Sequence, residues 1–211
     1  MAKTEPFDKY QAEYDKWFGK NYRVYRSELN AVRSVAEITD DAVEIGIGSG
    51  MFAVPLGINR GVEPSEAMRK TACESGLDAI DGVAEKLPYE DNCTGYVLMT
   101  TTLCFVDDSY KAVKEVFRIL KPDGVFVLGF VDKNSPLGKI YNKKKDKSLF
   151  YKNAVFYSTD EVHTLLENAG FTIEKTIQTV FGALNEIREI QDVKDGYGEG
   201  SFIVIKASKT G

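Results

Sequence analysis

The sequence predicts a single α/β domain with a doubly wound, mostly parallel seven-stranded sheet, an antiparallel last strand, helices on both faces and an N-terminal helical cap. An apolar run at residues 42–45 leads into three glycines at alternate positions, which is typical of a buried strand turning sharply into a helix. Strand and helix patterns alternate from there onward, and this alternation favours parallel pairing. Two closing strand patterns follow without a long helix between them, which favours an antiparallel final strand.

The N-terminal residues 7–35 are expected to be helical and to belong to a cap formed by residues 1–38. Their aromatic side chains recur at helical spacing: Tyr10, Tyr14, Trp17 and Phe18, then Tyr22 and Tyr25. Gly19 and Asn21 are expected to divide the segment into two helices. We interpret most of this aromatic face as core packing. A second interpretation is that it lines a ligand cleft, where tyrosine and tryptophan rings suit a cation or a sulfonium.

The glycine turn at residues 46–50 is a candidate site for a nucleotide-like ligand. Without Cβ atoms, a ligand can lie against backbone N–H groups at a helix N-terminus. The dinucleotide fingerprint places its third glycine one position later, where this chain has Met51, and no Gly-Lys-Ser/Thr follows. The pattern is therefore acidic-x-G-x-G-x-G, with Glu44 as the acid. A glycine-rich turn that binds nothing is the alternative interpretation.

A second acidic residue supports a nucleoside ligand. Glu63 ends the next strand pattern, nineteen positions after Glu44, and Pro64 and Ser65 begin a helix that ends before Gly76. A carboxylate at a strand end can accept hydrogen bonds from both ribose hydroxyls. The two features together make a chance match less credible than either alone.

The remaining helices and strands are predicted from the periodicity of apolar residues, from helix-capping residues and from glycine and proline breaks. We expect a short helix at 52–56, strands at 77–81 and 96–99, a helix at 108–120, a strand at 125–130, a helix at 161–169, and strands at 171–177 and 201–207. Ser158 with Glu161 forms a capping-box pattern. Segment 132–153 is an insert after the fifth strand, with a helix start at Ser135-Pro136.

Several motifs resemble those of class I (Rossmann-like) S-adenosylmethionine-dependent methyltransferases, and most closely the ubiquinone-biosynthesis-like type that acts on small molecules. The resemblance rests on the glycine loop, on Glu63, on Ala84-Glu85-Lys86-Leu87-Pro88 and on Leu120-Lys121-Pro122-Asp123-Gly124. It covers residues 40–207. It implies S-adenosylmethionine as the cofactor and methyl transfer to a small amine, as an N-methyltransferase would perform it, or to another small metabolite.

The resemblance also implies which residues contact the cofactor. These are Glu44 beside its ammonium group, the loop glycines, the ribose acid and its neighbour, the adenine segment and the end of the fourth strand: Glu44, Gly46, Gly48, Gly50, Glu63, Pro64, Ala84, Glu85, Thr100 and Thr101. Val83 and Gly95 stand where the family carries Asp, so the hydrogen bond to the adenine is left open. Glu85 has a solvated loop charge as its alternative interpretation.

On the acceptor side, the candidate substrate-binding residues are Tyr14, Trp17, Tyr22, Cys104 and Tyr151. The insert at 132–153 is expected to act as a lid. Its basic run at 143–147 is more typical of a solvated helix face than of an anion-binding lid. The catalytic residue is unknown, and Tyr157, His163 and Glu199 are candidates for a general base. A neutral amine acceptor needs no base before attack.

Composition excludes several classes of function. The net charge of −5 provides no basic field for nucleic acid, and 43% hydrophobic residues suffice for one core. Three scattered cysteines and one histidine argue against a metal site and for a reducing compartment. Since no leader or membrane-length apolar run is evident, we expect a cytoplasmic protein. The oligomeric state is left open. A non-catalytic S-adenosylmethionine-binding or regulatory protein, an NAD-dependent oxidoreductase and, more weakly, an RNA methyltransferase are the alternatives.

Overall fold

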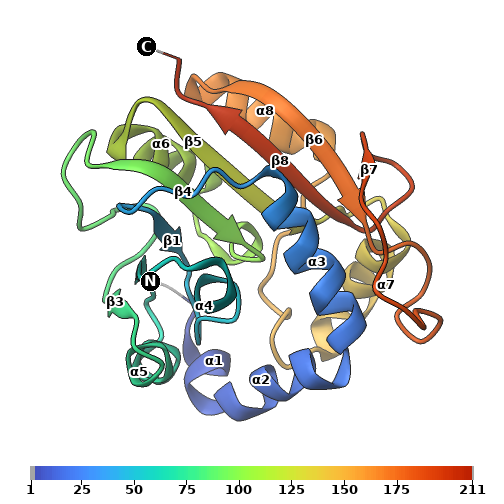
Figure 1. Cartoon of the computed structure of the whole chain (residues 1–211). Helices are drawn as coiled ribbons and strands as arrows, with labels where there is room; N and C mark the ends of the chain where they lie inside the picture. The colour runs from blue at the N-terminus through green and yellow to red at the C-terminus, as the bar shows by residue number, and fades with distance from the viewer. Residues whose placement is uncertain (1–2, 211) are drawn as a thin grey trace.

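The computed structural model describes residues 3–210, which form a three-layer α/β fold around an eight-stranded sheet (Figure 1). Its strand order is β3-β2-β1-β4-β5-β8-β6-β7. In that order the strands are β3 (Asp78–Ile80), β2 (Arg60–Val62), β1 (Val43–Ile45), β4 (Thr94–Thr100), β5 (Leu120–Val131), β8 (Phe202–Ser208), β6 (Thr172–Thr179) and β7 (Lys194–Asp195). Strands β3, β2, β1, β4 and β5 pair in parallel, and β8 is antiparallel to both β5 and β6.

This topology confirms the predicted doubly wound, mostly parallel sheet with an antiparallel last strand. The sheet has one strand more than predicted. The additional strand, β7, comprises two residues in the polar connection after β6 and pairs with Ile177 and Gln178 of that strand. Two exposed residues carry too little periodicity to be recognised as a strand in a sequence.

The helices cover both faces of the sheet (Figure 1). They are α1 (Glu5–Lys9), α2 (Gln11–Lys20), α3 (Tyr22–Val35), α4 (Ala53–Leu56), α5 (Glu66–Glu74), α6 (Ser109–Ile119), α7 (Pro136–Lys144) and α8 (Thr159–Ala169), with 3₁₀ turns η1 (Leu103–Phe105) and η2 (Lys145–Lys147). Helices α6 and α8 share one apolar cluster with the sheet, whereas α3 and α4 share the other. Within the described residues, no helix combines the length and apolarity needed to cross a membrane.

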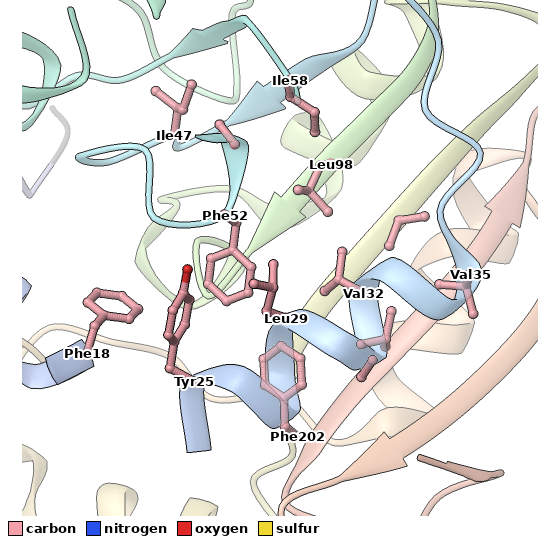
Figure 2. Close-up of a cluster of buried hydrophobic side chains, with 14 of the residues drawn as sticks. Phe18, Tyr25, Leu29, Val32, Val35, Ile47, Phe52, Ile58, Leu98 and Phe202 are labelled. Atoms are coloured by element: carbon pink, nitrogen blue, oxygen red, sulfur yellow. The ribbon is translucent and has the colours of Figure 1, made fainter. Parts of the chain in front are cut away.

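Figure 2 shows the cluster on the α3 face, where aromatic rings from the N-terminal helices join the core. Phe18 packs edge-on against Tyr25 with ring centroids 5.2 Å apart, and Tyr25 packs in the same way against Phe52 at 5.7 Å. Leu29 and Phe202 are almost fully buried in this cluster. Core packing therefore accounts for much of the aromatic face, as the spacing indicated.

The N-terminal segment breaks at positions that differ partly from the prediction. Asn21 separates α2 from α3 as expected, but Gly19 lies inside α2, and a further break occurs at Tyr10. A single glycine is tolerated in a helix at a modest cost, so Gly19 alone does not end one. The Asn21 side chain instead donates to the Trp17 carbonyl and helps to terminate α2.

Three predicted helix starts are confirmed by their capping hydrogen bonds. Ser65 Oγ accepts from Met68 N–H, and Ser135 Oγ accepts from Gly138 N–H. Ser158 and Glu161 complete the capping box in both directions. Each cap satisfies backbone donors that the first turn of a helix leaves free.

Two departures from the family pattern have structural explanations. Asp123 replaces a glycine and adopts φ 61°, a left-handed conformation that Asp tolerates better than most residues. The segment around it belongs to β5, which therefore begins at Leu120 rather than at the predicted 125. At Gly95, a Cβ would lie about 3.2 Å from Thr39, and Asp41 Oδ1 already accepts the Gly95 N–H at 3.0 Å. An acidic side chain from the preceding loop thus stands at the entry of β4.

Candidate active site

A cavity of about 390 Å³ lies at the carboxyl ends of β1, β2 and β4. Open α/β sheets bind their ligands at this edge, and the volume suits a nucleoside-sized molecule. Strand ends provide one wall, the segments 82–85 and 105–108 with Lys111 provide another, and the N-terminal helices provide a third. Residues 3–20 therefore lie over the cavity mouth.

Two of the three loop glycines form a cradle in this cavity. Gly46 and Gly48 line it, with φ values of 70° and 56°. A Cβ on Gly48 would meet no atom within 4 Å, so this position faces open space. Gly50 does not line the cavity, and a Cβ there would lie 2.6 Å from Leu77 Cδ1. Gly50 is thus required for packing, whereas Gly48 leaves room for a ligand.

The Glu63 carboxylate lies beside the cradle, as the sequence predicted. It lines the cavity and accepts hydrogen bonds from the Gly48 and Ser65 N–H groups, each at 2.9 Å. Burial raises its pKa, and these two N–H groups act in the opposite direction. Two backbone bonds hold the carboxylate in place, and its remaining lone pairs are free to accept ligand hydroxyls.

Glu44 is not among the residues that line the cavity, so its expected contact with the cofactor stays a prediction. Its register partner in β4 is Leu98, and both side chains lie on the α4 face of the sheet. Glu44 Oε1 accepts from Thr100 Oγ1 at 2.7 Å, while Oε2 has no hydrogen-bond partner in the part of the chain that the structure describes. Burial raises the pKa of Glu44 to about 8. Glu44 therefore contacts a residue that lines the site.

The segment after β3 contributes Val83, Ala84 and Glu85 to the cavity wall. Glu85 is not a free loop charge, because its Oε1 accepts the N–H groups of Asp107 and Asp108 and so ties the segment to the start of α6. The family's Asp at position 83 is absent, and Val83 provides no side-chain hydrogen bond. Only backbone groups of Val83 are therefore available to hydrogen-bond a ligand at this position.

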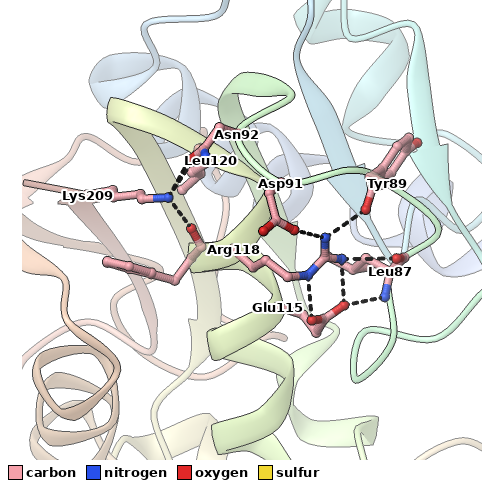
Figure 3. Close-up of polar contacts among 9 residues, drawn as sticks. Leu87, Tyr89, Asp91, Asn92, Glu115, Arg118, Leu120 and Lys209 are labelled. Atoms are coloured by element: carbon pink, nitrogen blue, oxygen red, sulfur yellow. Dashed lines mark hydrogen bonds and ion pairs between the residues drawn. The ribbon is translucent and has the colours of Figure 1, made fainter. Parts of the chain in front are cut away.

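Arg118 of α6 contacts the loop at 87–91, which follows this segment (Figure 3). Its guanidinium donates to the carbonyls of Leu87 and Tyr89 and forms ion pairs with Asp91 and Glu115. Glu115 in turn accepts the Leu87 N–H at 2.8 Å. One side chain thus satisfies four neighbouring polar groups and connects the loop at 87–91 to α6.

Polar contacts fasten the N-terminal helices to three sides of the cavity. Asp8 Oδ1 accepts from Ser65 Oγ at 2.7 Å and from the Ala67 N–H at 3.3 Å, at the start of α5. Ser49 Oγ of the glycine loop donates to Asp15 at 2.6 Å. Lys3 forms an ion pair with Asp107 at 3.1 Å. The sequence motifs missed Lys3, Thr4 and Phe7, since nothing local marks them as cavity residues.

A second cavity of about 20 Å³ lies beyond the end of β4 and has room for about one water molecule. Its wall is mainly aromatic: Thr101, Leu103, Cys104, Phe130, Val131, Tyr141, Tyr151, Phe156 and Tyr157. Tyr151 stacks on Tyr141 at 5.2 Å and on Phe105 at 5.8 Å. Because Phe105 lines the large cavity, this ring cluster separates the two spaces.

Thr101 lines both cavities, which places it at their boundary. Its φ of 51° is left-handed, an uncommon and strained conformation for a β-branched residue. The Thr101 N–H donates to the Gly129 carbonyl of β5 at 2.8 Å, which helps to hold this conformation. The chain therefore turns at the point where the two cavities meet.

The structure brings together most of the predicted site residues. Those that line the large cavity are Gly46, Gly48, Glu63, Pro64, Ala84, Glu85, Thr100, Thr101 and Tyr14. Cys104, Tyr151 and Tyr157 line the small cavity. Burial raises the pKa of the Cys104 thiol to about 12, so the thiol stays protonated and is no nucleophile.

The structure places four other candidates elsewhere. Trp17 packs edge-on against Phe18, and Tyr22 is 52% exposed beside Arg26. His163 lies on α8 against Thr176 of β6, and Glu199 forms an ion pair with Lys194 in the β7 region. Neither His163 nor Glu199 lines either cavity, so they are not retained as bases.

Comparison with known protein families and sequences gives consistent matches. The family described as "Methyltransferase domain" matches residues 43–128. An uncharacterized protein of Methanocaldococcus jannaschii is 41% identical over 203 residues, covering 96% of this chain and 98% of that protein. Demethylmenaquinone methyltransferase of Staphylococcus aureus is 26% identical over 185 residues, covering 72% of this chain and 76% of that enzyme.

Solved structures agree with the fold. The crystal structure of an S-adenosylmethionine-dependent methyltransferase of Thermotoga maritima, described as a "possible histamine N-methyltransferase", superposes with a TM-score of 0.95 at 47% identity, over 98% of this chain and 100% of that one. The methyltransferase bound to the Haloferax volcanii Trm112 activator superposes with a TM-score of 0.74 at 16% identity, over 100% of this chain and 99% of that one, which shows a shared fold alone.

Proposed function

The chain belongs to the class I S-adenosylmethionine-dependent methyltransferases, and from this premise we propose that it methylates a small-molecule acceptor, preferentially an amine. The cofactor is S-adenosylmethionine, and the protein is an enzyme. One observation carries the proposal for the acceptor. The nucleoside-sized cavity and the aromatic cavity meet at Thr101, at the carboxyl end of β4.

The residues of the large cavity fit the cofactor. The Glu63 carboxylate can accept the ribose hydroxyls, and the open space over Gly48 admits a ligand close to the backbone. The segment around Ala84 offers an apolar wall and backbone groups for the adenine. When bound, S-adenosylmethionine supplies an electrophilic methyl group on a sulfonium.

The chain's own contribution to the reaction is mainly positioning and exclusion of water. The N-terminal helices cover the large cavity, and aromatic rings enclose the small one. Holding a nucleophile in the correct geometry can contribute roughly 7–11 kcal/mol to lowering a barrier. A neutral amine needs no base before it attacks, so the absence of His163 and Glu199 from the site is compatible with this reaction.

The preference for an amine has two supports. Tyr14, Tyr141 and Tyr151 present electron-rich rings, which stabilise the positive charge that a neutral amine nitrogen gains as it accepts the methyl group. The Thermotoga maritima relative carries the description "possible histamine N-methyltransferase", and we extend this acceptor class to the present chain as part of the proposal. Tyr157, which lines the small cavity, is the one base candidate that we keep for acceptors with a proton to lose.

We also propose that residues 1–38 and 132–153 act as a cap and a lid on a single domain. The lid segment leaves β5 and is followed by α8, and the two ends meet at a narrow neck, where the Lys133 N–H donates to the Tyr157 carbonyl at 2.9 Å. Asp132 accepts hydrogen bonds from the Thr159 N–H and hydroxyl on the same neck. An anchored neck allows the segment between its ends to move as a unit.

The proposal is tested by donor binding and by methyl transfer. Calorimetry should detect binding of S-adenosylmethionine and of S-adenosylhomocysteine, and NAD should not compete. Incubation with methyl-labelled donor and matched panels of amines, phenols and thiols should give the fastest labelling of an amine. Binding of NAD without binding of the methyl donor would overturn the proposal, and exclusive labelling of phenols or thiols would overturn the preference for amines.

A further inference from the structure

Phe150 belongs to the lid segment, but its ring packs against the N-terminal helices. Its centroid lies 5.6 Å from that of Phe7 in α1 and 5.5 Å from that of Tyr14 in α2. Phe7 and Tyr14 both line the large cavity, and their rings meet edge-on with centroids 5.6 Å apart. The three rings thus form one cluster, in which a lid residue packs on two residues of the large-cavity wall.

Tyr151, the next residue along the chain, belongs to the wall of the other space. It lines the small cavity and stacks on Tyr141 with centroids 5.2 Å apart. Two consecutive residues therefore reach the walls of two different cavities. Because a trans peptide fixes consecutive Cα atoms at about 3.8 Å, Phe150 and Tyr151 cannot be displaced far independently of each other.

The turn that carries both rings is closed by its own hydrogen bonds. Lys145 Nζ donates to the Ala154 carbonyl at 3.2 Å, which joins the two ends of the turn. Inside it, the Tyr151 N–H donates to Ser148 Oγ at 3.1 Å, and the Ala154 N–H donates to the Tyr151 carbonyl at 2.9 Å. Residues 145–154 are therefore tied into one body, and both rings move with it.

Phe150 provides the direct connection between the lid segment and the first two helices. Among the ring contacts of residues 3–210, only those of Phe150 join the lid segment to α1 and α2. Over the same residues, no hydrogen bond or ion pair joins these two parts. Phe105 contacts both Phe7 and Tyr151, but it lies in η1 just after β4 and so offers them a surface that is fixed to the sheet.

We propose that Phe150 is a positioning residue that couples the lid to the N-terminal helices, so that closure over the methyl donor also closes the acceptor site. The inference rests on the proposed function, because it deepens the roles of cap and lid proposed there. A ligand in the large cavity lies against Phe7 and Tyr14 and favours the position in which they close it. Since Phe150 packs on both, the same ligand also favours the closed lid, although no residue of 132–153 lines that cavity.

The coupling acts in both directions. The small cavity has room for about one water molecule, so an acceptor must displace rings of its wall, Tyr151 among them. Displacement of Tyr151 carries Phe150 away from the N-terminal helices and loosens the wall over the donor. The two spaces therefore open together for ligand exchange and close together against water during transfer.

Amide hydrogen exchange, measured by mass spectrometry on the whole chain, tests this coupling with S-adenosylhomocysteine as the probe. In the wild-type protein, saturation with this ligand should slow exchange in α1 and α2, which cover the large cavity. We expect it to slow exchange in 136–154 as well, by about fivefold or more, although that segment does not line the cavity. Amides of α8, which packs on α6 and β6, are the internal control and should not change.

Phe150→Ala removes the connection and leaves the lining of the large cavity intact. S-adenosylhomocysteine should still bind and still protect α1 and α2, but exchange in 136–154 should stay within about twofold of the ligand-free rate. Phe150→Tyr keeps the ring and should restore the protection of that segment. Leu149→Ala, which shortens an exposed side chain next to Phe150, is the matched control and should behave as the wild type.

Calorimetry with S-adenosylhomocysteine and an unchanged circular dichroism spectrum show that each variant is folded. Phe150→Leu keeps apolar bulk without a ring; it should lose most of the protection of 136–154, and it carries the test if Phe150→Ala does not fold. Ligand binding to the wild-type protein without slower exchange in 136–154 would overturn the inference, as would protection of that segment that persists in Phe150→Ala, or equal slowing in α8. Those results leave methyl transfer itself standing. Failure of the wild-type protein to bind S-adenosylhomocysteine would contradict the proposed function instead, which keeps the two failures distinct.

Discussion

Gly48 and Gly50 are two positions apart in one loop, and both need a left-handed φ, but a side chain would meet different surroundings at each. Ala at either position should cost about 1–2 kcal/mol of unfolding free energy through the backbone. Only Gly48→Ala places its methyl group in the cavity. We therefore expect Gly48→Ala to weaken S-adenosylmethionine binding by at least about tenfold, measured by calorimetry.

Gly50→Ala is the matched control for this prediction. Its Cβ would meet Leu77, so it should lose more unfolding free energy than Gly48→Ala, measured by urea denaturation, and less donor affinity. The reverse order of the two effects would show that the cradle is assigned to the wrong glycine.

Substitution of Glu63 is expected to cause the largest loss of affinity for S-adenosylmethionine. Glu63→Ala removes the acceptor of two backbone N–H groups as well as the proposed ribose contacts. Hydrogen bonds to charged groups contribute roughly 1.5–3 kcal/mol each, so donor affinity should fall by about 100-fold or more. Glu74→Ala, an exposed acid on α5, serves as the control and should leave calorimetric affinity unchanged. Retention of affinity in Glu63→Ala would remove Glu63 from the site.

At the scale of an element, Arg118 connects α6 to the loop at 87–91, which directly follows the cavity-lining residues 82–85. Arg118→Gln breaks the ion pairs with Asp91 and Glu115 and frees the carbonyls of Leu87 and Tyr89. We expect a loss of about 1–2 kcal/mol of unfolding free energy and a several-fold loss of donor affinity. Arg23→Gln, at an exposed position of α3, is the control in both urea denaturation and calorimetry. A loss of stability without loss of affinity would mean that the wall keeps its shape without Arg118.

The N-terminal helices are a second element whose effect can be measured. Asp8→Ala removes the acceptor for Ser65 Oγ and for the Ala67 N–H, which hold α1 against α5. We expect the donor to dissociate several-fold faster in stopped-flow displacement, since a looser cap opens more often. Association should change less, and the free energy of unfolding should stay close to that of the wild type. An unchanged dissociation rate would show that α1 does not control release.

The elements were predictable where their signals are local. The caps at Ser65, Ser135 and Ser158 each depend on residues within three positions along the chain, and all three predictions were confirmed. By contrast, Asp8 and Ser65 are 57 positions apart, and only packing brings their side chains within hydrogen-bond distance. The same reason explains why Lys3 and Phe7 were missed as cavity residues.

For the whole molecule, three buried acids with raised pKa values, Glu28, Glu44 and Glu63, make stability depend on pH. Glu28 and Glu44 have pKa values of about 8 in the folded chain, against 4.5 for an unperturbed Glu. A raised pKa means that the folded state holds its proton where the unfolded state has lost it. The stabilisation is therefore fully present below about pH 4.5 and is lost as the pH rises towards 8, by at most about 1.4 kcal/mol per pH unit for each group.

We expect the free energy of unfolding of the donor-free protein to fall between pH 5.5 and pH 8, as measured by urea denaturation. Glu28→Gln and Glu44→Gln should each flatten this slope, and the double variant should flatten it further. Asp41, whose pKa is lowered chiefly by its hydrogen bond to Lys121, acts only at acidic pH and does not affect this window. A slope that is the same in all variants would contradict the assignment of both acids.

The walls of the two cavities come mostly from different stretches of the sequence. Residues that line the large cavity end at Lys111, whereas the aromatic wall that only the small cavity uses comes largely from 130–157. The neck between Lys133 and Tyr157 makes that stretch one contiguous unit. Substitutions confined to residues 130–157 can therefore reshape the small cavity while every residue that lines the large cavity is kept.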